Sequence, residues 1–174
     1  MVDALRIQPL TSTGFAPFGD VVEFEGRDSF PINKGMADRY HALADVELGG
    51  EHARAIISLV DSRKFDMPRK VDHLEYHPLG SQAFLPLDTN PFIVVVAPAA
   101  NQPDLGMLAA FVTNGRQGIN YRLGTWHHVL LTPYAAMRFI CVDRTGPGDN
   151  CIDFFIPESV SYTHLTLPTI TSGG

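Results

Sequence analysis

Two short stretches of the sequence bring together side chains that can do chemistry. Glu75 and His77 are separated by one residue, and Gln82 follows them after a Pro-Leu-Gly turn. Side chains of a strand alternate between its faces, so Glu75 and His77 project to one side and a returning strand brings Gln82 beside them. A later stretch ends in the adjacent residues His127 and His128, of which one must face inward. Carboxylate, imidazole and amide groups in this arrangement can transfer protons or hold a divalent ion.

Each of these residues also has a purely structural explanation. An exposed charge pair would explain Glu75 and His77, although Glu is rarely buried without a task. His73 and His164 are better interpreted as hydrogen-bonded packing residues, and Trp126 as a packing residue at the end of a barrel. We expect His128 to face outward or to support the site.

The elements that must position these residues are short strands separated by turn residues. Turns are indicated by Pro78-Leu79-Gly80, Asn114-Gly115 and Gly146-Pro147-Gly148. The apolar or alternating runs between the turns are Leu5–Leu10, Asp20–Phe24, Ala53–Val60, Val71–His77, Gln82–Leu87, Phe92–Ala97, Leu108–Val112, Gln117–Tyr121, Trp126–Leu131, Met137–Val142 and Cys151–Ile156. This pattern predicts an all-β fold, an antiparallel jelly-roll-like barrel with few short helices. Short helical turns are expected after Thr11 and after Pro103-Asp104, and residues 39–48 fit neither period.

Length and charge exclude several classes of protein. The 174 residues suit one domain, which we assign to residues 1–160, with residues 161–174 as an atypical tail that is artefactual or disordered. The net charge of −6 argues against nucleic-acid binding. No apolar run approaches the ~18 residues that cross a bilayer, and no signal peptide is apparent, so we expect a cytoplasmic protein with Cys141 and Cys151 reduced.

The four polar positions resemble the metal-binding pattern of cupins, with two departures. Cupins usually carry His-x-His, then Glu five residues later, then a distant His; here Glu75 replaces the first His and Gln82 replaces the Glu. A tentative metal set is therefore Glu75, His77, Gln82 and His127. One carboxylate and two imidazoles can still hold a divalent ion, and the Gln carbonyl oxygen is a weaker ligand.

Six ordered blocks of sequence resemble the ureidoglycolate lyase family, also called ureidoglycolate hydrolases. They are residues 30–35, 39–41, 75–86, 111–115, 118–121 and 126–128, and Asp143-Arg144 and Asp149-Asn150-Cys151 extend the match. The resemblance covers roughly residues 5–158. It implies a cupin-barrel homodimer that cleaves ureidoglycolate to glyoxylate and urea, late in the allantoin breakdown of purine catabolism. It also implies a divalent metal, for which nickel, manganese and zinc are candidates, and no organic cofactor.

Ureidoglycolate carries a carboxylate, a hydroxyl and a ureido nitrogen on one carbon, and each group needs a partner. Arg39, with Lys34 behind it, is our candidate for gripping the carboxylate. Glu75 is the candidate base if it is not a metal ligand, while His77 and His127 could act as the acid or bind a metal. Substrate hydrogen bonds are assigned to Asn33, Gln82, Asn120 and Tyr121. The catalytic set is thus Glu75, His77, His127 and Arg39.

Two other functions remain open at this stage. A different metal-dependent cupin enzyme, such as a dioxygenase or an isomerase, would need more imidazole than this pattern offers if it used iron. A non-catalytic cupin that binds a small carboxylate would need a separate partner protein, because no DNA-binding segment accompanies the barrel.

Overall fold

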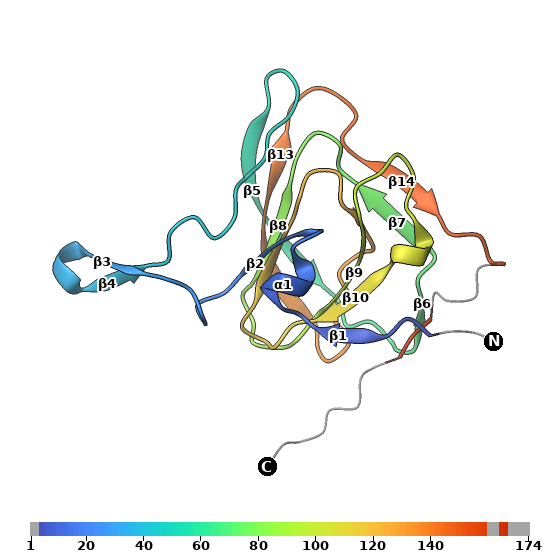
Figure 1. Cartoon of the computed structure of the whole chain (residues 1–174), viewed down its shortest axis with the longest axis horizontal. Helices are drawn as coiled ribbons and strands as arrows, with labels where there is room; N and C mark the ends of the chain where they lie inside the picture. Colours follow the sequence, from blue (N-terminus) through green and yellow to red (C-terminus); the bar gives the residue numbers. More distant parts are fainter. Residues whose placement is uncertain (1–3, 160–163, 167–174) are drawn as a thin grey trace, which may run out of the picture.

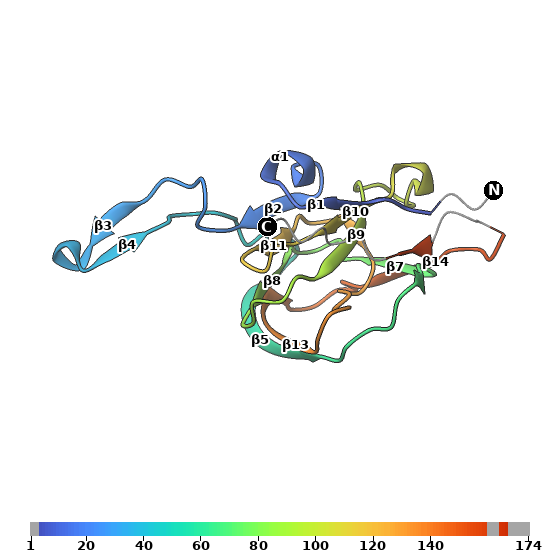
Figure 2. The ribbon, with the colours of Figure 1, turned by 90° about the horizontal axis from the view of Figure 1, so that it is seen from below.

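The computed structural model describes residues 4–159 and 164–166, most of which lie in or between two facing β-sheets (Figures 1 and 2). The six-stranded sheet has the order β1 (Ile7–Pro9), β10 (Ala109–Val112), β9 (Ile93–Ala97), β12 (Trp126–His127), β7 (His73–Tyr76) and β14 (Ile152–Phe155). The five-stranded sheet has the order β2 (Gly19–Val22), β11 (Gly118–Tyr121), β8 (Gln82–Pro86), β13 (Met137–Thr145) and β5 (Arg54–Ser62). We call these two sheets the body.

The strand pairs of the body are antiparallel except for β1 with β10. The prediction of an all-β, mostly antiparallel fold is therefore confirmed, and each of the eleven expected runs overlaps a strand. Strands β14 and β5 each form an edge of their sheet, and no ladder joins these two edges among the described residues.

Helical structure in the described part of the chain is confined to short turns. Helix α1 (Ser12–Phe15) begins after Thr11, whose hydroxyl accepts a hydrogen bond from the backbone N–H of Gly14. A 3₁₀ turn, η2 (Leu105–Met107), follows Asp104, as expected from the sequence. No helix in the described ranges is long and apolar enough to span a membrane.

Strand β9 lies at the centre of the core because both of its faces are covered. All five of its residues are fully buried. Val94 and Val96 pack between the sheets with Phe92, Tyr121 and Phe139, whereas Ile93 and Val95 pack on the outside of the six-stranded sheet. An unbroken apolar run is typical of a strand covered on both sides.

The C-terminal tail contributes one described strand. β15 (His164–Leu165) pairs with β6 (Arg69–Lys70), and Leu165 is fully buried in the outer core cluster. The remaining tail residues, 161–163 and 167–174, lie outside the described residues. The assignment of the tail as artefactual or disordered thus stays a prediction.

A hairpin that the sequence did not predict projects from the body. It consists of β3 (Phe30–Ile32), the 3₁₀ turn η1 (Asn33–Gly35) and β4 (Ala37–Arg39), and we call residues 30–39 the arm. Both views show the arm extending away from the two sheets, at the opposite end of the long axis from β7 and β14 (Figures 1 and 2).

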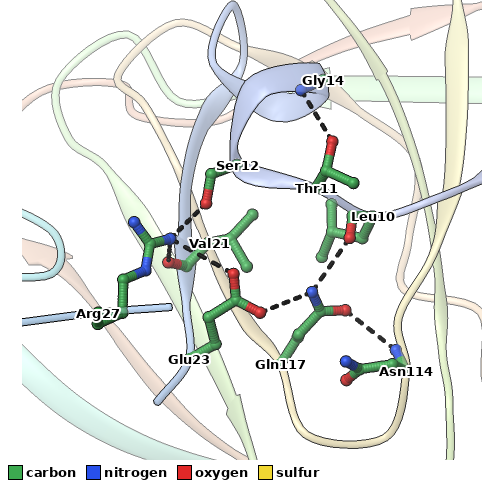
Figure 3. Close-up of polar contacts among 9 residues, drawn as sticks. All are labelled: Leu10, Thr11, Ser12, Gly14, Val21, Glu23, Arg27, Asn114 and Gln117. Carbon is green, nitrogen blue, oxygen red and sulfur yellow. Dashed lines mark hydrogen bonds and ion pairs between the residues drawn. The ribbon is translucent and has the colours of Figure 1, made fainter. Parts of the chain in front are cut away.

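The segment that leads into the arm is tied to the body by a polar network (Figure 3). Arg27 donates hydrogen bonds to the hydroxyl of Ser12 and, at 3.0 Å, to the carbonyl of Val21, and it lies 3.5 Å from the Glu23 carboxylate. The amide of Gln117 in turn donates to the other oxygen of Glu23 at 2.8 Å. These bonds hold the chain in a defined position shortly before the arm begins.

Candidate active site

Strand register brings the candidate residues of both sheets to one place between them. In the six-stranded sheet His127 of β12 lies directly opposite Glu75 of β7, and in the five-stranded sheet Tyr121 of β11 lies opposite Gln82 of β8. Side chains directly opposite in an antiparallel pair are close neighbours on one face. His77 follows β7 and completes the group, so we call Glu75, His77, Gln82, Tyr121 and His127 the cluster.

The cluster is connected by short polar and aromatic contacts. Nε2 of His127 lies 3.8 Å from Oε1 of Glu75, and Nε2 of His77 lies 3.2 Å from Oε1 of Gln82. The rings of His77 and His127 have their centres 5.1 Å apart, and Tyr121 stacks on His127 at 4.3 Å. The two imidazoles therefore face one carboxylate and one amide across a small space.

The loop before β14 fixes the orientation of His77. Its Nδ1 lies 2.7 Å from the carbonyl oxygen of Asn150, while the side-chain oxygen of Asn150 accepts a hydrogen bond from the backbone N–H of Leu79. A carbonyl can only accept, so Nδ1 of His77 carries a proton and donates it. Nε2 faces the side-chain oxygen of Gln82 at 3.2 Å, which also only accepts, so a proton on Nε2 would be donated to Gln82 inside the cluster.

Burial sets the protonation states of the other groups. His127 is 2% exposed, and its burial, with neighbouring His77, His128 and His73, holds its pKa well below the usual value. His127 is therefore neutral at physiological pH. Burial, with a smaller effect of the Glu75 charge, raises the pKa of Tyr121 above its usual value, so its phenol stays protonated.

Three side chains of the cluster fit a divalent metal ion. One ligand atom from each of Glu75, His77 and His127 lies within 4.8 Å of the other two. One carboxylate and two imidazoles form a common ligand set for divalent transition metals, and a carbonyl bonded to the far nitrogen of a ligand His is the usual support. A second group, His73, Glu75 and Asp153, fits less well, because His73 and Asp153 already pair with each other at 2.6 Å.

Four residues assigned to the site from sequence are not brought to the cluster within one chain. Asn33, Lys34 and Arg39 lie on the arm, at the far end of the molecule from Glu75 (Figure 1). Asn120 is buried on the opposite face of β11 from Tyr121, and its amide donates to Asp20 and to the carbonyl of Asp45. Their roles in substrate binding stay predictions.

The structural interpretations of the other polar residues fit their surroundings. His73 pairs with Asp153, and the indole N–H of Trp126 donates to the carbonyl of Ala100 at 2.9 Å. The ring of His128 bonds through Nδ1 to the carbonyl of His73, which places it beside the cluster rather than in it.

Sequence reasoning missed three residues that touch the cluster: Asn150, whose carbonyl bonds to His77, and also Asp143 and Cys151. Asp143 accepts a hydrogen bond from the Gln82 amide at 3.2 Å, and its other oxygen is buried without a partner among the described residues. The thiol of Cys151 lies 3.6 Å from Glu75. Asp143 could have been found from alternation, because it shares the inward face of β13 with Phe139 and Cys141.

A surface groove of about 460 Å³ lies apart from the cluster and is mostly apolar. Its lining includes Phe24, Leu43, Leu85 and Leu87. It contains none of the cluster residues, so we place the chemistry between the sheets.

Comparisons with known proteins identify the family of the chain. A model of the ureidoglycolate lyase family matches residues 2–163. A ureidoglycolate lyase of Pseudomonas paraeruginosa is 53% identical over 154 residues, which cover 88% of this chain and 91% of the relative. Ureidoglycolate lyases of Pseudomonas aeruginosa and Pseudomonas fluorescens are also 53% identical over 88% of this chain, and 91% and 92% of the relatives are covered. The chain belongs to the ureidoglycolate lyase family of enzymes.

Proposed function

We propose that the cluster cleaves ureidoglycolate to glyoxylate and urea. The observation that carries the proposal is the meeting of one carboxylate and two imidazoles, Glu75, His77 and His127, between the sheets of a chain from this family. The substrate is small enough to be enclosed by one side chain from each of several strands. The reaction is an elimination, because a carbon–nitrogen bond breaks as a carbonyl forms.

The elimination needs one base and one acid. A base takes the proton of the substrate hydroxyl, the oxygen electrons form the carbonyl of glyoxylate, and the carbon–nitrogen bond electrons leave with the ureido nitrogen. An acid then protonates that nitrogen to give urea. General acid–base catalysis of this kind contributes about 10²- to 10⁴-fold to a rate.

Glu75 is the base in the arrangement that the geometry supports best. Its carboxylate lies 3.8 Å from Nε2 of His127 and within 4.8 Å of a ring nitrogen of His77. His127, held neutral by burial, is a poor acid. His77 is the better acid, because the carbonyl of Asn150 already accepts its Nδ1 proton and a proton on Nε2 would point into the cluster. Tyr121 and Gln82 offer hydrogen bonds to the substrate oxygens.

A divalent ion, with nickel, manganese and zinc as candidates, would be held by Glu75, His77 and His127, with the Gln82 oxygen beside them. Bound there, it would polarise the substrate oxygens as a Lewis acid. His77 and His127 would then use their Nε2 atoms as ligands, so His77 could not also be the acid. The two arrangements predict opposite effects of chelation.

The test is release of urea and glyoxylate from ureidoglycolate by the purified chain, with and without a chelator. The proposed activity would be refuted if neither product appears without chelator, with chelator, or after a divalent metal is added back. Loss on chelation and recovery with one metal would favour the metal arrangement, and unchanged release would favour Glu75 and His77 as an acid–base pair. Near-normal turnover of Glu75→Gln would exclude Glu75 as the base.

The same reasoning extends to the setting of the enzyme. We place it in the cytoplasm, in purine nitrogen recovery through allantoin degradation, with a small-molecule substrate. We also propose a homodimer, which is supported by the apolar residues that the outer face of the five-stranded sheet leaves exposed.

A further inference from the structure

The cluster contains no cation that could hold a carboxylate. Around it lie the carboxylates of Glu75, Asp143 and Asp153, and no described Lys or Arg forms an ion pair with any of them. Arg144, the nearest Arg along β13, donates to the carbonyls of Gly49, Gly146 and Pro147 instead. An anionic substrate placed beside these carboxylates therefore needs a positive charge from elsewhere.

The arm carries exposed cations but has little to pack against in its own chain. Its elements contact mainly one another, and Met36 is 85% exposed and Phe30 47% exposed. Lys34 and Arg39 are also exposed. A two-stranded hairpin is marginally stable at best in water, so this arm needs a surface to pack on.

The arm does not reach its own cluster. It extends from the body at the opposite end from β7 and β14 (Figures 1 and 2), and Arg27 holds the preceding segment through Ser12 and Val21 (Figure 3). Folding the arm back over its own site would require these contacts to be rearranged. The surface that receives the arm is therefore outside this chain.

The tip of the arm has a backbone conformation that also calls for support. Asn33 and Lys34 have φ angles of 53° and 57° and are followed by Gly35 at 84°. A left-handed conformation costs a non-glycine residue about 1–2 kcal/mol. Such conformations persist where surrounding structure determines them, and they are frequent at binding sites.

The body offers a matching surface for a second copy of the chain. On the outer face of the five-stranded sheet Ile57 is 78% exposed, Leu59 is 76% exposed and Leu87 is 56% exposed. Strand β5, which carries Ile57 and Leu59, is also an edge strand of the five-stranded sheet. A long apolar edge strand is a strong site for association, and closed twofold dimers are the commonest assembly.

The edge strand β5 lies next to the strand that carries Asp143. Ile56 of β5 lies opposite Asp143 of β13, and Ile56 and Ser58 are exposed although their strand positions face inward. On β14, Asp153 lies opposite Glu75. A chain docked on β5 therefore lies one strand away from Asp143, which accepts a hydrogen bond from Gln82 of the cluster.

We propose that the arm of a second copy of this chain completes the active site, with Lys34 and Arg39 binding the carboxylate of the substrate. In a twofold dimer each copy gives its arm to the other, so two complete sites form. This arrangement rests on the proposed function and accounts for arm residues that lie far from the cluster of their own chain.

Subunit complementation tests the exchange of arms. One variant, Glu75→Gln/His77→Asn, loses the chemistry but keeps its arm; the other, Lys34→Ala/Arg39→Ala, keeps the chemistry but loses the cations. Each alone should show a kcat/KM at least 10-fold below wild type. Co-expressed in equal amounts, half of the dimers are mixed, and each mixed dimer has one complete site, so about a quarter of wild-type activity should return.

The outcomes separate the possible arrangements. An arm that acts on its own chain would give no recovery, because every site would then lack either the chemistry or the cations. Full activity of Lys34→Ala/Arg39→Ala alone would also overturn the proposal. Arg63→Ala/Lys64→Ala, which removes two exposed cations outside the arm, is the matched control and should keep wild-type activity.

A measurement of mass keeps the proposal testable apart from activity. Wild type should be a dimer in light scattering. Phe30→Ser/Met36→Ser should raise the dissociation constant of the dimer at least 10-fold. Met107→Ser, which changes an exposed residue of η2, should leave the dissociation constant unchanged. Wild type that releases no urea would refute the proposed function, and the measured masses would then be the test of the arm exchange. The arm exchange would be overturned by a monomeric wild type, or by a dimer whose dissociation constant the arm substitutions do not change.

Discussion

Tyr121→Phe separates a functional from a structural role for a buried hydroxyl. Tyr121 is 2% exposed, stacks on His127 and packs among the core residues of both sheets. Its hydroxyl is buried with no hydrogen-bond partner among the described residues. A buried polar group left unpaired costs a protein about 1–3 kcal/mol, so the group must have a use that offsets this cost.

The expected magnitudes follow from that position. Phenylalanine keeps the ring and its stacking on His127 and removes only the unpaired oxygen. The free energy of unfolding should therefore stay unchanged or rise, by up to about 1–3 kcal/mol. If the hydroxyl donates to an anionic substrate oxygen, its loss removes about 1.5–3 kcal/mol of binding, which corresponds to a fall in kcat/KM of about 10- to 150-fold.

Two assays on the same preparation check this prediction. Urea denaturation gives the free energy of unfolding, and urea release from ureidoglycolate gives kcat/KM. Tyr134→Phe, a substitution outside the cluster, is the matched control and should leave kcat/KM unchanged. A loss of stability above 1 kcal/mol in Tyr121→Phe would show that the hydroxyl has a structural bond, and unchanged kcat/KM would show that it does not contact the substrate.

Three further predictions concern protonation and packing. Burial lowers the pKa of His127 in the native state, so below pH ~6.5 the unfolded state binds a proton that the native state does not. In the presence of chelator the free energy of unfolding should therefore decrease as the pH is lowered through this range. The decrease should be less steep in His127→Asn. Burial, followed by the charge of Glu75, raises the pKa of the Cys151 thiol to about 11. Alkylation of Cys151 at pH 8 should therefore be roughly 100-fold slower than alkylation of an ordinary thiol, and it should be faster in Glu75→Gln than in wild type. An ordinary alkylation rate in the wild type would contradict the raised pKa. Gly115→Ala should cost more than about 2 kcal/mol in denaturation, because φ is 85° and a Cβ would lie 2.2 Å from the carbonyl oxygen of Thr89; an unchanged midpoint would refute the close approach.

Local patterns in the sequence were enough to predict the strands of the body. Short apolar runs bounded by Gly, Pro and Asn predict where strands begin and end, and alternation predicts that Glu75 and His77 share a face. Cross-strand register could not be predicted in this way, because it depends on how distant segments pair. The contact of Asp143 with Gln82 is a result of that register, so alternation could have placed Asp143 on the inward face of β13 but could not have shown which residue it contacts.

The arm shows the second limit of sequence reasoning. Asn33, Lys34 and Arg39 were assigned to the site because their side chains can bind the substrate and their sequence blocks match the family, and neither argument tells which copy of the chain a residue serves. The structure shows that they lie on a hairpin remote from the cluster of their own chain (Figure 1). Whether they bind substrate is thus a question about the assembly.

The chemistry of the cluster and the position of the arm both concern how an anionic substrate binds among carboxylates. Glu75 must be ionised to act as a base, and Asp143 is bonded to Gln82 of the same cluster, so an anionic substrate enters against a negative field. A divalent ion or the cations of a second chain would each offset that field, but they act on different parts of the reaction. Removing the metal would change the chemical step, whereas removing Lys34 and Arg39 would chiefly weaken substrate binding and raise KM. Measuring kcat and KM separately in chelated enzyme and in Lys34→Ala/Arg39→Ala therefore distinguishes the two sources of positive charge. If chelation and the double substitution change kcat and KM in the same way, the metal and the arm cations do not act independently.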